Sequence, residues 1–156
     1  MTKRGYTLIE LLVVVSIIGI LTGIGVVAYN DFNQKQTLKG GALNVKNNLR
    51  FVQNKALAGE KPTGCSVLNG YGVNFPNNAT YEFAAICGGI LKPATSFPTL
   101  PNGVTFSPVP SPITFKVLGQ GVGSAQTICL SGFARTYKIS VTISGEIQDE
   151  GFIACP

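Results

Sequence analysis

The sequence predicts an α+β protein, in which one long N-terminal α-helix precedes an antiparallel β-sheet domain. Three observations favour this class. Residues 6–29 are apolar or small with a single charge, residues 30–61 carry apolar side chains at helical spacing, and residues 62–156 hold short β-rich runs between glycines and prolines. We expect the second half of the helix to pack on the sheet and the first half to remain bare.

The composition argues against an enzyme. Of the 156 residues, 45% are hydrophobic and only 12% are charged, which is about half the usual quarter. This balance argues against a disordered chain and indicates that some apolar sequence meets lipid or protein. Histidine is absent, which removes the commonest general base and the commonest metal ligand. We predict no catalytic residue, no metal site and no cofactor.

The first helical segment is long enough to span a membrane. Its 24 residues, 6–29, make a helix of about 36 Å, against a hydrocarbon core of about 30 Å. Lys3 and Arg4 precede it and the next basic residue is Lys35, which places the N-terminus in the cytoplasm and the rest of the chain outside. A secretory signal peptide is the alternative, but its apolar core usually has about 7 to 15 residues.

An ordinary single-pass anchor leaves Glu10 unexplained. A charged side chain costs about 2.5 to 3.5 kcal/mol at the centre of a membrane and therefore normally has a partner. The sequence around it, residues 3–15, is KRGYTLIELLVVV. This segment resembles the class III signal of type IV pilins and type II secretion pseudopilins. In that family a basic leader ends in Gly and precedes an aromatic residue, Thr-Leu-x-Glu and a long apolar helix.

The resemblance implies a pilin fold and a defined maturation. A membrane prepilin peptidase would remove the leader, residues 1–5, between Gly5 and Tyr6, and the new amino group of Tyr6 would be methylated. Glu10 would then pair with the Tyr6 ammonium of a neighbouring subunit during assembly. The implied partners are other pilin or pseudopilin subunits, bound through the N-terminal helix, and an inner-membrane assembly platform. The implied location is the cytoplasmic membrane, as a single-pass protein with a periplasmic or extracellular globular domain, and then a filament.

Residues 30–61 predict an amphipathic helix. Six apolar residues recur at separations of three and four, namely Leu38, Ala42, Val45, Leu49, Val52 and Ala56. This stripe predicts a face that packs on the sheet. Gly40 and Gly41 interrupt the segment and predict a weak point or hinge, at a cost of about 1 kcal/mol per glycine. Gly59 and Pro62 signal the end of the helix.

The strands predicted after the helix are short. They are residues 71–75, 80–83, 104–106, 113–117 and 127–130, and the clearest run, 137–144, alternates apolar and polar side chains. Residues 93–112 contain six prolines and predict a loop with at most an edge strand. Gly119, Gly121 and Gly123 lie between strands without a following helix, which favours a flexible turn over a phosphate-binding loop.

The β-rich part is expected to contain disulfides. Its four cysteines are Cys65, Cys87, Cys129 and Cys155, and none forms a C-x-x-C pair. This spacing favours two structural disulfides in an oxidising compartment over metal binding or thiol chemistry. Three pairings are open, and we favour Cys65 with Cys87 and Cys129 with Cys155 because each of these closes a local loop.

A second resemblance concerns the type of subunit. Residues 48–65, NLRFVQNKALAGEKPTGC, resemble the helix end and first cysteine of H-type minor pseudopilins and FimT-like minor pilins. Val27 stands where many pilins have Pro, which suits a minor subunit. We therefore predict a noncatalytic structural subunit, a minor pilin or pseudopilin of a type IV pilus-like or type II secretion filament.

The alternative is a DNA-uptake minor pilin of a competence-type pilus. DNA binding needs clustered cations. The net charge of +5 lies mainly in residues 31–61, which hold six basic and two acidic residues. The globular part offers Lys116, Arg135 and Lys138, with acidic residues close to them in sequence. We therefore favour the structural subunit over the DNA-binding one.

Overall fold

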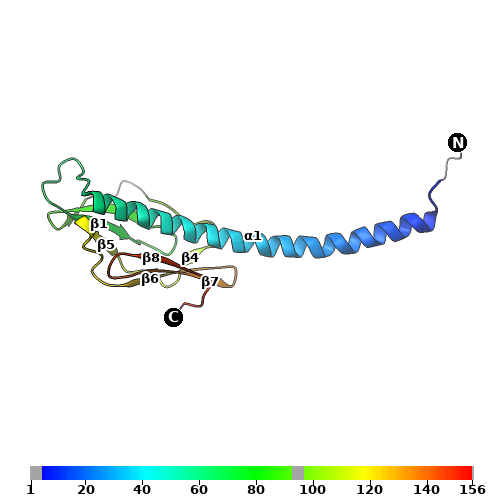
Figure 1. Ribbon diagram of the computed structural model, residues 1–156. Helices are drawn as coiled ribbons and strands as arrows, with labels where there is room; N and C mark the ends of the chain where they lie inside the picture. The colour runs from blue at the N-terminus through cyan, green and yellow to red at the C-terminus, as the bar shows by residue number, and fades with distance from the viewer. Residues whose placement is uncertain (1–4, 93–96, 156) are drawn as a thin grey trace. The chain divides into compact units, whose positions relative to one another are not determined.

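The computed structural model describes residues 5–92 and 97–155 and confirms the α+β class (Figure 1). One long helix, α1 (Leu8–Ala58), precedes a series of short strands. The predictions that concern the basic leader residues and residues 93–96 lie outside the described residues.

The chain forms two compact units, Met1–Lys35 and Gln36–Pro156. The first unit contains the start of α1. From Leu8 to Leu21 its large apolar side chains are 50–81% exposed, and this part of the helix is long and apolar enough to cross a membrane. A helix that exposes apolar side chains all round is unfavourable in water, so this unit needs lipid or other protein around it.

The second unit is organised around the remainder of α1. The predicted stripe is confirmed, because Leu38, Ala42, Val45, Leu49, Val52 and Ala56 are at most 1% exposed. They form one core cluster with side chains of the strands and loops, among them Tyr81, Phe115, Ile128 and Ile139. Burying a side chain the size of Leu or Val is worth about 1.5 to 3 kcal/mol. The stripe therefore holds this part of the helix on the sheets.

The strands form two four-stranded antiparallel sheets in the described residues, with the orders β3-β2-β1-β5 and β4-β6-β7-β8. In chain order they are β1 (Leu68–Asn74), β2 (Glu82–Cys87), β3 (Ile90–Leu91), β4 (Thr105–Phe106), β5 (Ile113–Lys116), β6 (Gln126–Gly132), β7 (Arg135–Val141) and β8 (Ile147–Gly151). A short 3₁₀ turn, η1 (Val117–Gly119), follows β5. The predicted runs overlap β1, β2 and β4 to β7, and β4 is an edge strand, as the prolines around it predict.

The clearest predicted strand ends earlier than its sequence pattern. β7 stops at Val141, and Ile143 is 65% exposed. The N–H of Thr142 donates to the carbonyl of Glu146 (2.9 Å), and Gly145, at a φ of +89°, donates to the carbonyl of Thr142 (2.8 Å). These hydrogen bonds close a turn that leads into β8. Periodicity does not reveal this turn, because its side chains continue to alternate.

α1 is continuous through Gly40 and Gly41, where the sequence predicts a weak point. A Cβ at Gly41 would lie 3.1 Å from Cδ of Pro101 and 3.7 Å from Cγ1 of Val104. Gly41 therefore lets the loop before β4 approach the helix closely. Packing against that loop compensates for the low helix propensity of glycine.

Two disulfides cross-link the second unit. Cys65–Cys87 joins the segment before β1 to the end of β2, and Cys129–Cys155 joins β6 to the C-terminal segment. The bonded cysteines are 22 and 26 residues apart. Each disulfide lowers the conformational entropy of the unfolded chain, which stabilises the folded domain by about 3 kcal/mol for loops of this size. This contribution matters in a small domain with short strands.

A charged cluster connects α1 to β7 and β8. Lys46 Nζ lies 3.0 Å from Asp149 Oδ2, and the hydroxyl of Tyr137 donates to Asp149 Oδ1 at 2.6 Å. Partial burial acts to raise the pKa of Asp149, but the hydrogen bonds from Tyr137 and Lys46 outweigh it and hold that pKa below its ordinary value. Burial, reinforced by the neighbouring carboxylate, raises the pKa of Tyr137 to about 12.

We expect Asp149→Asn to lower the free energy of unfolding by about 1 to 3 kcal/mol at pH 7, the usual range for a charged hydrogen-bond partner. Because folding lowers the pKa of Asp149, its stabilisation is present above the ordinary carboxyl pKa of about 4 and is lost as the pH falls through the folded-state value. Urea unfolding of the full chain in detergent, at several pH values below 7, measures this loss.

The matched control for that measurement is Glu150→Gln. It removes the neighbouring ion pair with Lys138, whose Nζ lies 3.0 Å from Glu150 Oε2, and leaves the contacts of Tyr137 and Lys46 in place. We expect a smaller change than for Asp149→Asn. A difference between Asp149→Asn and wild type that stays constant into strong acid would contradict the assignment.

Candidate functional site

The candidate site is the short segment that precedes α1. Gly5, Tyr6 and Thr7 lie outside the helix, and Tyr6 is 84% exposed. Among the described residues, no atom beyond the chain neighbours lies within 4 Å of the position that a Cβ at Gly5 would occupy. The peptide bond between Gly5 and Tyr6 is therefore open to an approaching enzyme.

A capping box begins the helix. α1 starts at Leu8, which makes Thr7 the N-cap residue and Glu10 the third helical residue. The N–H of Glu10 donates to Thr7 Oγ1 at 3.3 Å, and the N–H of Thr7 donates to Glu10 Oε2 at 3.5 Å. This role was not among the predictions from the sequence, although T-x-x-E before an apolar run is the signature of a capping box. Glu10 thus has a function within its own helix as well as any function between subunits.

The other polar side chains of the apolar segment form hydrogen bonds within the helix. Ser16 Oγ donates to the Leu12 carbonyl at 2.8 Å, and Thr22 Oγ1 donates to the Ile18 carbonyl at 2.7 Å. This arrangement leaves neither hydroxyl unpaired in lipid. Glu10 differs, because its hydrogen bond to an N–H does not neutralise its charge, and it is the single charged residue between Tyr6 and Asn30.

Comparison with known families shows what this segment is. Residues 1–26 match the family model described as the prokaryotic N-terminal methylation motif. The chain carries a class III prepilin-type signal. Such signals mark precursors of the type IV pilin and pseudopilin superfamily, so the chain is a pilin-like precursor, and its signal implies processing by a prepilin peptidase and assembly with other pilins. No solved structure matches the chain.

The prepilin signal covers only part of the resemblances found in the sequence. The match includes Gly5, Tyr6 and Glu10 and ends at residue 26. It does not reach residues 48–65, on which the resemblance to H-type pseudopilins and FimT-like pilins rests. The subtype therefore stays a prediction, as do the individual roles of the three residues.

The cations considered for DNA binding lie on different sheets. Lys116 ends β5 in the first sheet, whereas Arg135 and Lys138 belong to β7 in the second. Lys138 is also paired with Glu150, which competes with phosphate for its charge. The structure adds no observation in favour of the DNA-uptake alternative, and a salt titration of DNA binding by the chain would test it.

The other groups to consider as a site are the cysteine and acidic side chains. Residues 5–92 and 97–155 contain no group of three Cys, Asp or Glu side chains placed to hold a metal ion. All four cysteines form disulfides. The chemistry that the N-terminal segment supports is recognition and cleavage by another protein.

Proposed function

We propose that the chain is a noncatalytic structural subunit, a minor pilin or pseudopilin, of a type IV pilus-like or type II secretion filament. The observation that carries the proposal is a prepilin-type signal directly before a helix whose apolar side chains are exposed. Such a helix needs lipid around it before assembly and other helices around it afterwards.

In this proposal each part of the chain acts at one stage of maturation, membrane anchoring or assembly. The peptidase removes residues 1–5 between Gly5 and Tyr6, and Tyr6 is methylated on its new amino group. Residues 6–29 hold the subunit in the cytoplasmic membrane and later in the filament core. The amphipathic segment, predicted over residues 30–61 and helical as far as Ala58, carries the globular domain, residues 62–156, on the periplasmic or extracellular side. An inner-membrane assembly platform transfers the subunit from the membrane to the filament.

Polar contacts and close packing drive that transfer in this proposal. Lipid tails and neighbouring helices both cover apolar side chains, so the hydrophobic term changes little. Gly19 and Gly23 leave room for another helix, because a Cβ at either position would meet no atom within 4 Å among the described residues. Glu10 gains a cation when the Tyr6 ammonium of a neighbouring subunit approaches, so one ion pair sets the register of assembly.

We expect Gly5→Ala to abolish maturation. Wild-type chain recovered from membranes that contain a prepilin peptidase is expected to lack Met1 to Gly5 and to carry one methyl group on Tyr6. The variant is expected to keep an intact, unmethylated N-terminus. Because a Cβ at Gly5 meets no other described atom, this loss would report on the peptidase and not on folding. Intact mass and N-terminal sequencing measure both events.

The control is Gly19→Ala, a second exposed glycine with free space around its Cβ position. It lies downstream of the cleaved bond, and we expect normal cleavage. A membrane sample without the peptidase should keep the leader in all three proteins. The proposed function is wrong if the wild-type chain remains uncut in the presence of an active prepilin peptidase.

A further inference from the structure

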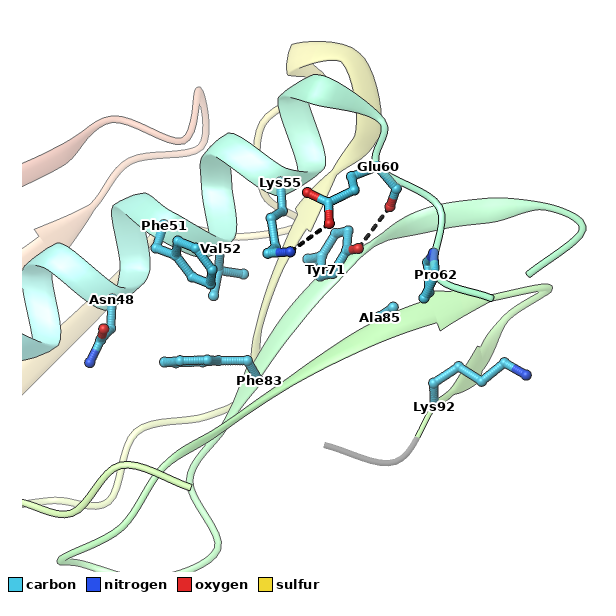
Figure 2. A pocket seen from close by; sticks show the side chains of 10 residues that line it. All are labelled: Asn48, Phe51, Val52, Lys55, Glu60, Pro62, Tyr71, Phe83, Ala85 and Lys92. Carbon is cyan, nitrogen blue, oxygen red and sulfur yellow. Dashed lines mark hydrogen bonds and ion pairs between the residues drawn. The ribbon is translucent and has the colours of Figure 1, made fainter. Parts of the chain in front are cut away.

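The second unit contains a pocket that the processing signal does not explain. It has a volume of about 520 Å³ and lies between the flank of α1 and the first sheet (Figure 2). Its lining residues are Asn48, Phe51, Val52, Lys55, Glu60, Pro62, Tyr71, Phe83, Ala85 and Lys92. This volume lies within the range of about 300 to 1,000 Å³ that is typical of small-molecule sites.

Three aromatic rings from three elements form the walls of the pocket. Phe51 comes from α1, Tyr71 from β1 and Phe83 from β2. The centroids of Phe51 and Phe83 are 6.4 Å apart, and Phe51 is 51% exposed. The hydroxyl of Tyr71 donates to the backbone carbonyl of Glu60 at 2.7 Å, which holds the Tyr71 ring in place. The walls are therefore aromatic and partly open to solvent, as an apolar ligand requires.

The ammonium group of Lys55 already lies against two of the aromatic rings that line the pocket. Lys55 Nζ lies 5.2 Å from the ring centroid of Phe51 and 6.0 Å from that of Tyr71. A second cation would be repelled there, although aromatic walls alone would favour one. Figure 2 shows the Lys55 ammonium directed to the Glu60 carboxylate, whose Oε1 is 2.7 Å away. The pocket therefore combines an apolar wall with a place for a negative charge.

We infer that this pocket binds a small aromatic or aliphatic carboxylate. The apolar body of the ligand lies against Phe51, Tyr71 and Phe83, and its carboxylate takes the place of Glu60 at Lys55. Lys92 also lines the pocket, but Figure 2 shows its ammonium directed away from Lys55, so Lys55 is the cation that the inference uses. The inference is independent of the proposed filament role, because every residue involved lies in the second compact unit.

Breaking the ion pair between Lys55 and Glu60 costs a ligand little free energy. The side chains of Lys55 and Glu60 are 29% and 57% exposed, and ion pairs this open to water contribute little to stability. The Glu60 side chain can turn to solvent, while its backbone carbonyl keeps the hydrogen bond from Tyr71. The ligand carboxylate and the Glu60 carboxylate therefore compete for one ammonium group, and this competition gives the inference a distinctive test.

The test uses 4-benzoylbenzoate, an aromatic carboxylate that cross-links to nearby C–H bonds on illumination. The full chain in nonionic detergent is labelled over a range of probe concentrations, and the labelled peptides are identified by mass spectrometry. We expect saturable labelling of the peptides that contain Phe51, Tyr71 or Phe83. Labelling of the apolar N-terminal helix, through probe dissolved in the micelle, should rise without saturation. Neutral benzophenone, which lacks the carboxylate, should label the pocket with a half-saturating concentration about three- to ten-fold higher.

Two charge variants should act in opposite directions. Lys55→Gln removes the proposed anion partner and should raise the half-saturating concentration about three- to ten-fold, as expected for the loss of a partly exposed charged hydrogen bond. Glu60→Gln removes the competitor and should lower it about two- to five-fold. The control Lys39→Gln, on the exposed surface of α1, should leave it unchanged. A site for cations would instead be weakened by Glu60→Gln, and that result would overturn the inference.

A pair of size variants tests the location of the site. Ala85→Leu fills the pocket from the sheet and should abolish saturable labelling, whereas Ala58→Leu, at the exposed end of α1, should not affect it. Circular dichroism and intact disulfides establish that Ala85→Leu is folded. Should Ala85→Leu fail to fold, the two charge variants still decide the question. Saturable labelling outside the pocket, or no response to Lys55→Gln, would also overturn the inference.

Discussion

Glu10→Gln is expected to exclude the chain from filaments while leaving the start of α1 and leader cleavage intact. This change separates the capping role of Glu10 from its proposed role in assembly. A glutamine oxygen still accepts the hydrogen bond from the N–H of Thr7, so the capping box remains. It cannot neutralise the Tyr6 ammonium of a neighbouring subunit, which would then be buried among apolar helices without a counter-charge. Leaving one member of a buried ion pair unpaired costs about 3 to 5 kcal/mol.

Two further variants separate the contributions. Thr7→Ala removes the N-cap oxygen, which accepts from the N–H of Glu10 at 3.3 Å, and should weaken the helix start by about 1 kcal/mol. It keeps the charge of Glu10, so we expect incorporation close to wild type. Glu10→Ala loses both the charge and the hydrogen bond from the N–H of Thr7, and it should be excluded as fully as Glu10→Gln.

The measurement is the share of the chain recovered with filaments sheared from the cell surface or purified from membranes. Intact mass on the same samples reports leader removal, so that failed maturation is not confused with failed assembly. Normal incorporation of Glu10→Gln would contradict the ion-pair mechanism. Strong exclusion of Thr7→Ala would show that assembly requires the capping box as well as the charge.

Much of the fold follows from local sequence patterns. Separations of three and four residues from Leu38 to Ala56 predict the buried face of α1, because only one side of a helix meets the sheets. The alternation that predicts β7 also continues to Ile143, which lies in a turn made by backbone hydrogen bonds. β8 was not predicted because it too is defined by backbone hydrogen bonds and not by a side-chain pattern. Its sequence, IQDEG, is mostly polar, and it pairs with β7 along its backbone.

The two candidate sites differ in how visible they are in the sequence. The prepilin-type signal is contiguous, so residues 3–15 are sufficient to recognise it. The pocket is assembled from α1, the loop after it and two strands. Phe51, Tyr71 and Phe83 appear in the sequence as ordinary helix and strand residues. Only the tertiary fold places their rings beside Lys55, and no spacing rule predicts that arrangement.

The glycine motif after β5 is packed closely against a neighbouring turn, although its sequence favours a flexible turn. Gly121 has a φ of +72°, and a Cβ on it would overlap the carbonyl oxygen of Ile143. That oxygen accepts the N–H of Val122 at 2.9 Å, and the Gly121 carbonyl accepts the N–H of Lys116 at 2.9 Å. The segment therefore forms a closely packed, hydrogen-bonded junction between the end of β5 and the turn after β7. The flexible turn that the sequence favours is not what the structure shows.

We expect Gly121→Ala to lower the free energy of unfolding by about 3 kcal/mol or more. The left-handed backbone alone costs a residue with a Cβ about 1 to 2 kcal/mol, and the overlap with a hydrogen-bonded carbonyl forces the junction apart in addition. Urea unfolding of the full chain in detergent measures the loss. Where the variant does not fold, loss of the cooperative transition is the same result in a stronger form.

The neighbouring glycines are matched controls. Gly119→Ala has the same backbone penalty, at a φ of +77°, but its Cβ would meet only Leu57 Cδ2 at an ordinary 3.5 Å, so a loss of about 1 to 2 kcal/mol is expected. Gly123→Ala meets no atom within 4 Å among the described residues and should stay within about 0.5 kcal/mol of wild type. A flexible turn would tolerate alanine equally at all three positions. A graded series with Gly121 the most sensitive is therefore what distinguishes a packed junction from a flexible linker.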